Sequence, residues 1–154
     1  MLVKVEAVPL TQTLRLKGGI GADAPFWDAL DDGAFRLPQC SGCGRWTWPA
    51  HFRCGECGSW NFEWIAVSPH GQVYTWTRNH AASDVVRERR AMLPYVSLLV
   101  ELPEAGCVRI AGVLAGSDSG LRIGAPVRGE IRPADAISKG YATMVWRLTE
   151  GASA

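Results

Sequence analysis

Four of the chain's five cysteines fall within one stretch of eighteen residues, and this spacing constrains the fold more than any other feature. Two cysteines three residues apart can present both sulfurs to one metal ion from a tight turn. The glycine after each pair, Gly44 or Gly58, can adopt a positive φ that turns backbone N–H groups toward the sulfurs. The sequence therefore predicts one metal site with four sulfur ligands. These ligands are Cys40, Cys43, Cys54 and Cys57.

Composition and charge place the chain among globular proteins. Its 154 residues are 47% hydrophobic and 20% charged, which is typical of a folded domain. The formal net charge of +1 gives no overall field toward nucleic acid or an acidic membrane. The N-terminus lacks the apolar core of a secretory signal, and no apolar run is long enough to span a bilayer. We therefore expect a cytoplasmic protein with no membrane segment.

Zinc is the metal that the four cysteines favour, because reduced cytoplasmic C-x-x-C pairs commonly form structural zinc sites. Iron in a rubredoxin-like site is the main chemical alternative. A redox-active cysteine pair or two disulfides are less favoured readings. With all four positions filled by sulfur, no position stays open for water or substrate, so the zinc is expected to be structural. Arg45 and Arg53 each adjoin a cysteine, where their charges could offset that of the thiolates.

The rest of the chain predicts one short helix and several short strands. Asp23 can cap a helix, Pro25 suits its first turn, and Gly33 is a natural stop. Beyond Gly71 the pattern alternates with period two, which is typical of strands. The expected strands are residues 62–67, 72–77, 95–102, 108–114, 127–131 and 143–148. The segment 81–92 is expected to be a loop.

The predicted fold class is mostly β, with a short N-terminal helix. Short strands without long helices between them indicate a five-stranded Greek-key barrel of the OB type, although periodicity is equally compatible with a small sandwich. The expected division is an arm and amphipathic helix at 1–37, a zinc ribbon at 38–66, the barrel at 67–149 and a flexible tail at 150–154.

No catalytic constellation is evident in the sequence. Cys107 stands alone before a predicted strand, and a nucleophilic role would require a base beside it. The sequence contains three histidines, and none has a carboxylate at a spacing that indicates a catalytic pair. They are His51, His70 and His80. We interpret Cys107 as a buried or edge thiol and His51 as a surface residue beside the metal loop.

Two groups of side chains are candidates for contact with a ligand or partner. Tryptophans of the ribbon either pack around the metal or present an aromatic surface. Arginines of the ribbon and of the loop 81–92 are either solvated or bind the phosphates of a small ligand. The candidates are Trp46, Trp48, Arg53, Arg87, Arg89 and Arg90.

The order of helix, four-cysteine ribbon and small barrel resembles a known family. These are the zinc-ribbon plus OB-fold proteins associated with acyl-CoA enzymes, long filed as domain-of-unknown-function family thirty-five. The resemblance covers roughly residues 23–148, and its matching stretches are residues 26–64, 70–77, 94–102 and 121–127. It implies a rubredoxin-like zinc ribbon with the four cysteines as ligands. The segment 50–52 and the arginine-rich loop 81–93 depart from the family pattern.

The resemblance also implies a function. Family members are non-catalytic accessory subunits that form hetero-oligomers with thiolase-fold enzymes, aldolases or MaoC-like hydratases, here expected in lipid or steroid side-chain metabolism. The barrel would dock on the enzyme, and the ribbon would help to hold acyl-CoA. One alternative is a module for single-stranded nucleic acid, which the near-neutral charge disfavours. A rubredoxin-like electron carrier is a further alternative.

Overall fold

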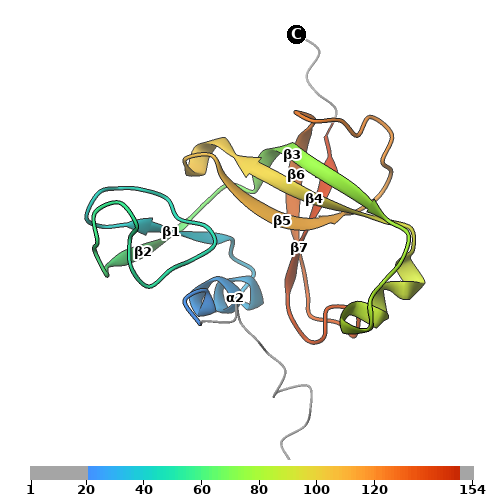
Figure 1. Ribbon diagram of the computed structural model, residues 1–154, viewed down its shortest axis with the longest axis horizontal. Helices are drawn as coiled ribbons and strands as arrows, with labels where there is room; N and C mark the ends of the chain where they lie inside the picture. The colour runs from blue at the N-terminus through green and yellow to red at the C-terminus, as the bar shows by residue number, and fades with distance from the viewer. Residues whose placement is uncertain (1–20, 150–154) are drawn as a thin grey trace, which may run out of the picture.

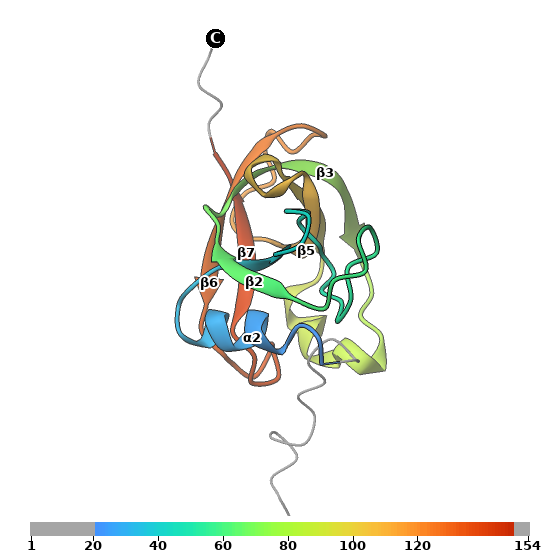
Figure 2. The same cartoon turned by 90° about the vertical axis from the view of Figure 1, so that its left-hand side faces the viewer.

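The structure, a computed structural model, describes residues 21–149. A two-stranded ribbon and a closed five-stranded barrel lie side by side, and a short helix lies beneath the junction between them (Figure 1). Turning the molecule by 90° places the ribbon and this helix in front of the barrel (Figure 2). The arm expected within residues 1–20 and the tail expected at 150–154 lie outside the described residues.

Helix α2 spans Ala24–Asp31 and ends before Gly33, whose φ of 75° reverses the chain direction. Proline lies in its first turn, as predicted. Asp23 occupies the N-cap position, but the expected side-chain cap is absent. Its Oδ2 instead accepts a hydrogen bond of 2.8 Å from Trp27 Nε1, so this carboxylate orients an indole.

The ribbon is formed by two antiparallel strands, β1 (Arg36–Cys40) and β2 (Phe62–Ala66). The sequence predicted β2 but missed β1, since Pro38 and a short span give no clean alternation. Strand β1 places Cys40 at the metal site and Leu37 in the hydrophobic core.

The barrel follows the order β3-β4-β5-β7-β6 and closes between β6 and β3, which confirms the predicted five-stranded fold of the OB type. The bounds of β4, β5 and β7 agree with the prediction, whereas β3 and β6 are longer than predicted. Residues Asp84–Met92, expected to be a loop, form the 3-10 segment η1. The strands are β3 (His70–Asn79), β4 (Tyr95–Leu102), β5 (Val108–Leu114), β6 (Pro126–Arg132) and β7 (Thr143–Leu148).

Trp146 fills the interior of the barrel. It lies on β7 and is fully buried. A Cβ atom placed on Gly112 of β5 would lie 2.5 Å from its indole nitrogen, and one on Gly129 of β6 would lie 2.9 Å from the far side of the ring. The strands on both sides of β7 therefore carry glycine where the tryptophan needs space.

One hydrophobic core joins the helix and the first strand to the barrel. Phe26 and Leu30 of α2, together with Phe35 and Leu37, belong to the same buried cluster as the barrel residues. The Phe35 ring meets Trp146 edge-on, with centroids 6.4 Å apart. This packing fixes the side of the barrel from which the ribbon projects.

Two places in the barrel wall are weakly paired. Strands β5 and β7 are parallel and joined only through Val113 with Val145 and Leu114 with Trp146. Strand β3 pairs with β6 only over residues 70–72, so its second half has no strand on its outer edge within residues 21–149. In this described part of the chain, no helix has the length and apolar character needed to cross a membrane.

Candidate metal centre and adjoining surfaces

The four predicted cysteines converge at one point of the ribbon. Their sulfurs all lie within 4.8 Å of one another. Cys40 Sγ lies 3.5 Å from Cys57 Sγ, and Cys43 Sγ lies 3.7 Å from Cys54 Sγ. A zinc ion bound by four thiolates at about 2.3 Å would separate the sulfurs by about 3.8 Å, so the cluster has the dimensions of a four-sulfur site.

Local backbone geometry brings these sulfurs together. Each C-x-x-C pair closes a tight turn in which a glycine N–H donates to the carbonyl of the first cysteine, from Gly44 to Cys40 at 2.8 Å and from Gly58 to Cys54 at 3.0 Å. Both glycines have φ near 75°, as the sequence predicted. The Gly42 N–H also points at Cys40 Sγ, at 3.4 Å, which stabilises a thiolate there.

The four thiols influence one another's ionisation. Burial raises the pKa of Cys40, but N–H groups of Cys43 and Gly42 and the neighbouring sulfurs outweigh burial and lower this pKa to about 6. The Arg45 N–H lowers the pKa of Cys43, but burial and the other sulfurs outweigh it and raise that pKa to about 12. At neutral pH the Cys40 thiol is therefore mostly ionised, whereas Cys43 keeps its proton until a metal ion displaces it.

Metal affinity is accordingly expected to fall as the pH falls. Below pH 6 even Cys40, whose pKa is lowered to about 6, becomes protonated, and protons then compete with the metal for its sulfur. We expect the apparent dissociation constant for Zn²⁺ to rise by at least about tenfold per pH unit there, one factor of ten for each proton displaced. Competition with a chromophoric chelator between pH 5 and 8 measures this. An affinity independent of pH would contradict the four-thiolate site.

The arginines next to the ligands contact neighbouring groups of the ribbon loops. Arg45 pairs with Glu56 at 2.5 Å on the surface. Arg53 donates from Nε to the Gly58 carbonyl at 3.0 Å and lies 5.8 Å from the exposed ring of Trp60. Both arginines therefore brace the loops of the ribbon.

The tryptophans of the ribbon divide into two groups. Trp46, Trp48 and Trp64 pack against the main core, whereas Trp60 is 69% exposed. Trp48 lies 4.4 Å from Phe26 between ring centroids, so it joins the ribbon to helix α2. Packing is therefore the role of three of these four rings.

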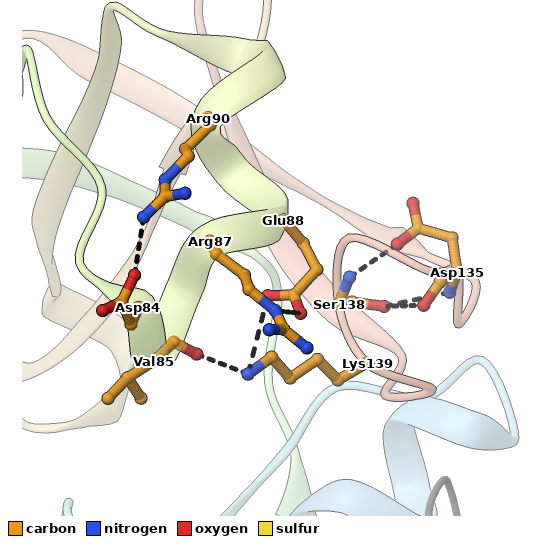
Figure 3. Close-up of polar contacts among 8 residues, drawn as sticks. All are labelled: Asp84, Val85, Arg87, Glu88, Arg90, Asp135, Ser138 and Lys139. Carbon is orange, nitrogen blue, oxygen red and sulfur yellow. Dashed lines mark hydrogen bonds and ion pairs between the residues drawn. The ribbon is translucent and has the colours of Figure 1, made fainter.

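The three arginines of segment 81–92 do not form one cluster. Arg87 pairs with Glu88 at 3.5 Å, and Arg90 pairs with Asp84 at 2.6 Å (Figure 3). Only Arg89 lines a cavity beside the barrel, where Arg132 joins it. No local pattern marks Arg132, because this residue meets Arg89 only through the packing of the loop after β6 against η1.

No nucleophile, base and orienting carboxylate are joined by hydrogen bonds within residues 21–149. The prediction for Cys107 is a buried or an edge thiol; its side chain is exposed, in the turn directly before β5, where its φ is 60°. It shares an open cavity with His51, but no hydrogen bond joins them. His70 Nδ1 lies 2.6 Å from Ser68 Oγ in an exposed turn, and no carboxylate orients this histidine among the described contacts.

The geometry defines a class of protein: a zinc ribbon packed on an OB-type barrel. Comparison with known families agrees with this class. Residues 27–63 match the description "ChsH2, rubredoxin-like zinc ribbon domain", and residues 64–132 match "ChsH2, C-terminal OB-fold domain". The chain therefore belongs to the ChsH2-type family of zinc-ribbon and OB-fold proteins, which is also called DUF35.

Two solved structures and one curated protein are similar to the chain. The structure titled "Ltp2-ChsH2(DUF35) aldolase" has a chain 26% identical, with a TM-score of 0.69, covering 82% of this chain and 94% of that one. A DUF35 protein from Sulfolobus solfataricus shares the fold, at 16% identity and a TM-score of 0.55 over 90% of this chain and 92% of that one. A "Probable enoyl-CoA hydratase alpha subunit" from Thermomonospora curvata is 28% identical over 117 residues, or 75% of this chain. The chain spans 35% of the length of that relative.

Proposed function

We propose that the protein is a non-catalytic accessory subunit that docks on an acyl-CoA-processing enzyme. The observation that carries this proposal is the likeness to the ChsH2 chain of an aldolase complex, which extends over ribbon and barrel together. The partner is a thiolase-fold enzyme, an aldolase or a MaoC-like hydratase, in a cytoplasmic hetero-oligomer that acts in lipid or steroid side-chain metabolism. The zinc ion is structural and holds the ribbon in shape.

The docking surface that we propose is the exposed side of β3 around Tyr74 and Trp76. Tyr74 and Trp76 are 41% and 39% exposed there, on a strand whose outer edge is unpaired within residues 21–149. Arg109 stacks 3.6 Å from the Tyr74 ring centroid and is held by Glu101 at 3.1 Å. A rigid aromatic surface beside a free strand edge suits a protein partner, which can add both side-chain packing and backbone hydrogen bonds.

The ribbon is proposed to lie near the acyl-CoA of the partner enzyme. Trp46, Trp48 and Arg53 are the ribbon residues for which this contact is proposed, and the family resemblance supports it. The packing of Trp46 and Trp48 against the main core supports a rigid arrangement.

Affinity purification of the tagged full-length protein from its native cells tests the proposal. We expect a thiolase-fold enzyme, an aldolase or a hydratase to be recovered at near-stoichiometric yield and identified by mass spectrometry. Trp76→Ala should weaken recovery at least about tenfold, as expected for an aromatic residue at the centre of an interface. Val85→Ala, which changes an apolar residue that is 75% exposed on η1, is the matched control and should bind normally.

Recovery of nucleic acid alone, released by salt, would overturn this proposal in favour of the single-strand binding module. The aromatic pair on β3 could stack on bases. However, Arg78 pairs with Asp118 and Arg109 pairs with Glu101, so carboxylates neutralise the nearest cations. The surface therefore favours a protein partner.

A further inference from the structure

The second half of strand β3 has a backbone edge that no other strand covers within residues 21–149. Strand β6 pairs with β3 only over residues 70–72, and a hydrogen bond of 2.9 Å from the Val73 N–H to the Ala125 carbonyl extends this contact by one residue. Over residues 74–79, no backbone hydrogen bond joins this edge to another described segment. The edge runs toward η1 on the right of the barrel (Figure 1). Unpaired N–H and C=O groups along such an edge can receive another strand.

The register between β3 and β4 shows which backbone groups point outward along this edge. Val73 directs its N–H and its carbonyl away from β4, toward the loop before β6. It lies opposite Val100 of β4, and Trp76 lies opposite Leu98, because a bulge adds one residue to β3 between them. Backbone groups along β4 alternate in direction with period two, so these two pairs are of the same kind. Trp76, and Arg78 two residues further, therefore also direct their N–H and carbonyl groups away from β4.

These outward groups match those of a second copy of the same strand. If two copies lie antiparallel with Thr77 at the twofold centre, Trp76 of each copy lies opposite Arg78 of the other. Residues opposed in this way exchange both of their hydrogen bonds, so every outward N–H and carbonyl of Trp76 and Arg78 is used. A centre at Arg78 would oppose two like charges, and a centre at Trp76 would oppose Arg78 to the bulge. The edge therefore favours the register centred on Thr77.

The side chains that meet in this register complement one another. Trp76 is 39% exposed, and the Arg78 side chain is 40% exposed while it pairs with Asp118. Directly opposed residues of antiparallel strands share a face, so each indole receives a guanidinium from the other copy in a cation–π contact. Thr77 is exposed, and on the other face it meets its own copy, where β-branched side chains pack well.

We infer that a second copy of this chain pairs with the outer half of β3, so that the protein by itself forms a symmetric dimer through one continuous sheet. Residues 75–79 of each copy form a small interface, and we expect a dissociation constant on the order of 10–100 µM. The same edge adjoins the docking surface of the proposed function, so the second copy and the enzyme would compete for it. This competition rests on the proposed function, whereas the self-pairing does not.

Sedimentation velocity of the full-length, zinc-loaded protein tests the pairing at concentrations below and above this value. A phosphine reductant keeps the exposed Cys107 from forming a disulfide between copies. We expect a reversible shift from monomer to dimer as the concentration rises.

Two substitutions at Arg78 separate its backbone from its side chain. Arg78→Pro removes an N–H that has no backbone partner among the described residues, so the barrel should stay folded while the dimer is lost. Arg78→Ala keeps this N–H and should weaken the dimer about fivefold, through loss of the cation–π contacts. Circular dichroism checks that each variant is folded.

A pair of charge variants tests the register. Thr77→Lys and Thr77→Glu should each weaken the dimer about fivefold, because like charges then meet at the twofold centre. An equimolar mixture of the two variants should dimerise more tightly than either variant alone, because opposite charges then meet. Phe52→Lys, at a ring that is 55% exposed on the ribbon, is the matched control and should dimerise like the wild type.

A wild type that stays monomeric up to about 1 mM would overturn the inference. So would a dimer that survives in folded Arg78→Pro, or a mixture of charge variants that dimerises no more tightly than its components. If the proline variant does not fold, the charge variants at the exposed position 77 decide the matter. Affinity purification separates these results from the proposed function. An enzyme recovered with a monomeric chain would leave the accessory role intact, and a dimer that recovers no enzyme would overturn that role and leave the self-pairing intact.

Discussion

In a Cys43→Ser variant, zinc content should fall well below one ion per chain, and residues 41–61 should lose their structure while the barrel stays folded. Serine is a far poorer zinc ligand than a thiolate, and three cysteines leave the coordination incomplete. Binding of structural zinc stabilises isolated zinc-finger peptides by about 10–16 kcal/mol. Loss of one ligand thus removes the largest stabilising contribution to the loops.

Apart from the metal, the ribbon loops are held mainly by Trp46 and Trp48, which pack against the main core. Between β1 and β2, the fully buried apolar residues are Ala50 and the ligand Cys54. Helix α2, Phe35 and Leu37 pack in the barrel core instead. We therefore expect the unfolded region to begin after Cys40, and not at the start of the chain.

Zinc analysis, far-ultraviolet circular dichroism and limited proteolysis measure these effects together. Cys107→Ser is the matched control, since this exposed thiol lies outside the sulfur cluster and its loss should leave the metal bound. If Cys43→Ser also abolished the β signal of the barrel, ribbon and barrel would form one cooperative unit.

Trp146→Ala should destabilise the protein by about 3–5 kcal/mol, the range for removing a large aromatic side chain from a core. The loss should lie toward the upper end of this range, because Gly112 and Gly129 offer no side chains that could move into the space. For a domain with a total stability of about 5–15 kcal/mol, this change brings the barrel near unfolding.

Urea denaturation with zinc present in excess measures the free energy of unfolding. Trp146→Phe should lose clearly less than Trp146→Ala, because Phe keeps most of the ring and removes a buried Nε1–H that has no partner. Trp60→Ala, at a ring that is 69% exposed, should change stability by no more than about 0.5 kcal/mol. Equal losses for Trp146→Ala and Trp60→Ala would contradict the central role of Trp146.

Local patterns in the sequence were sufficient to predict most of the fold. Residues 95–102 and 108–114 carry the alternation that a barrel wall requires, and their bounds agree with β4 and β5. Strand β1 could not be recognised, because it contains Pro38 and owes its extended form to pairing with β2. The 3-10 segment η1 was likewise hidden, since it buries none of its residues.

The metal site could be predicted because all four ligands lie in one short stretch of the sequence. The spacing of the cysteines and the glycine after each pair are both visible there. The anion-binding prediction for Arg87, Arg89 and Arg90 stays a prediction, and the structure divides these three side chains among different neighbours. The cavity itself was unpredictable from the sequence. Its walls come from α2, the ribbon, η1, four strands and the loop between β6 and β7, which tertiary folding alone brings together.

The short parallel ladder between β5 and β7 makes the resistance of the barrel wall to opening differ from one strand pair to the next. Moving these strands apart disturbs two residue pairs, Val113 with Val145 and Leu114 with Trp146, whereas β4 and β5 are joined along six. Local opening is easiest where the fewest backbone hydrogen bonds must break. The cavity that Arg89 lines adjoins these two strands, so part of its wall belongs to the region of the barrel that opens most easily.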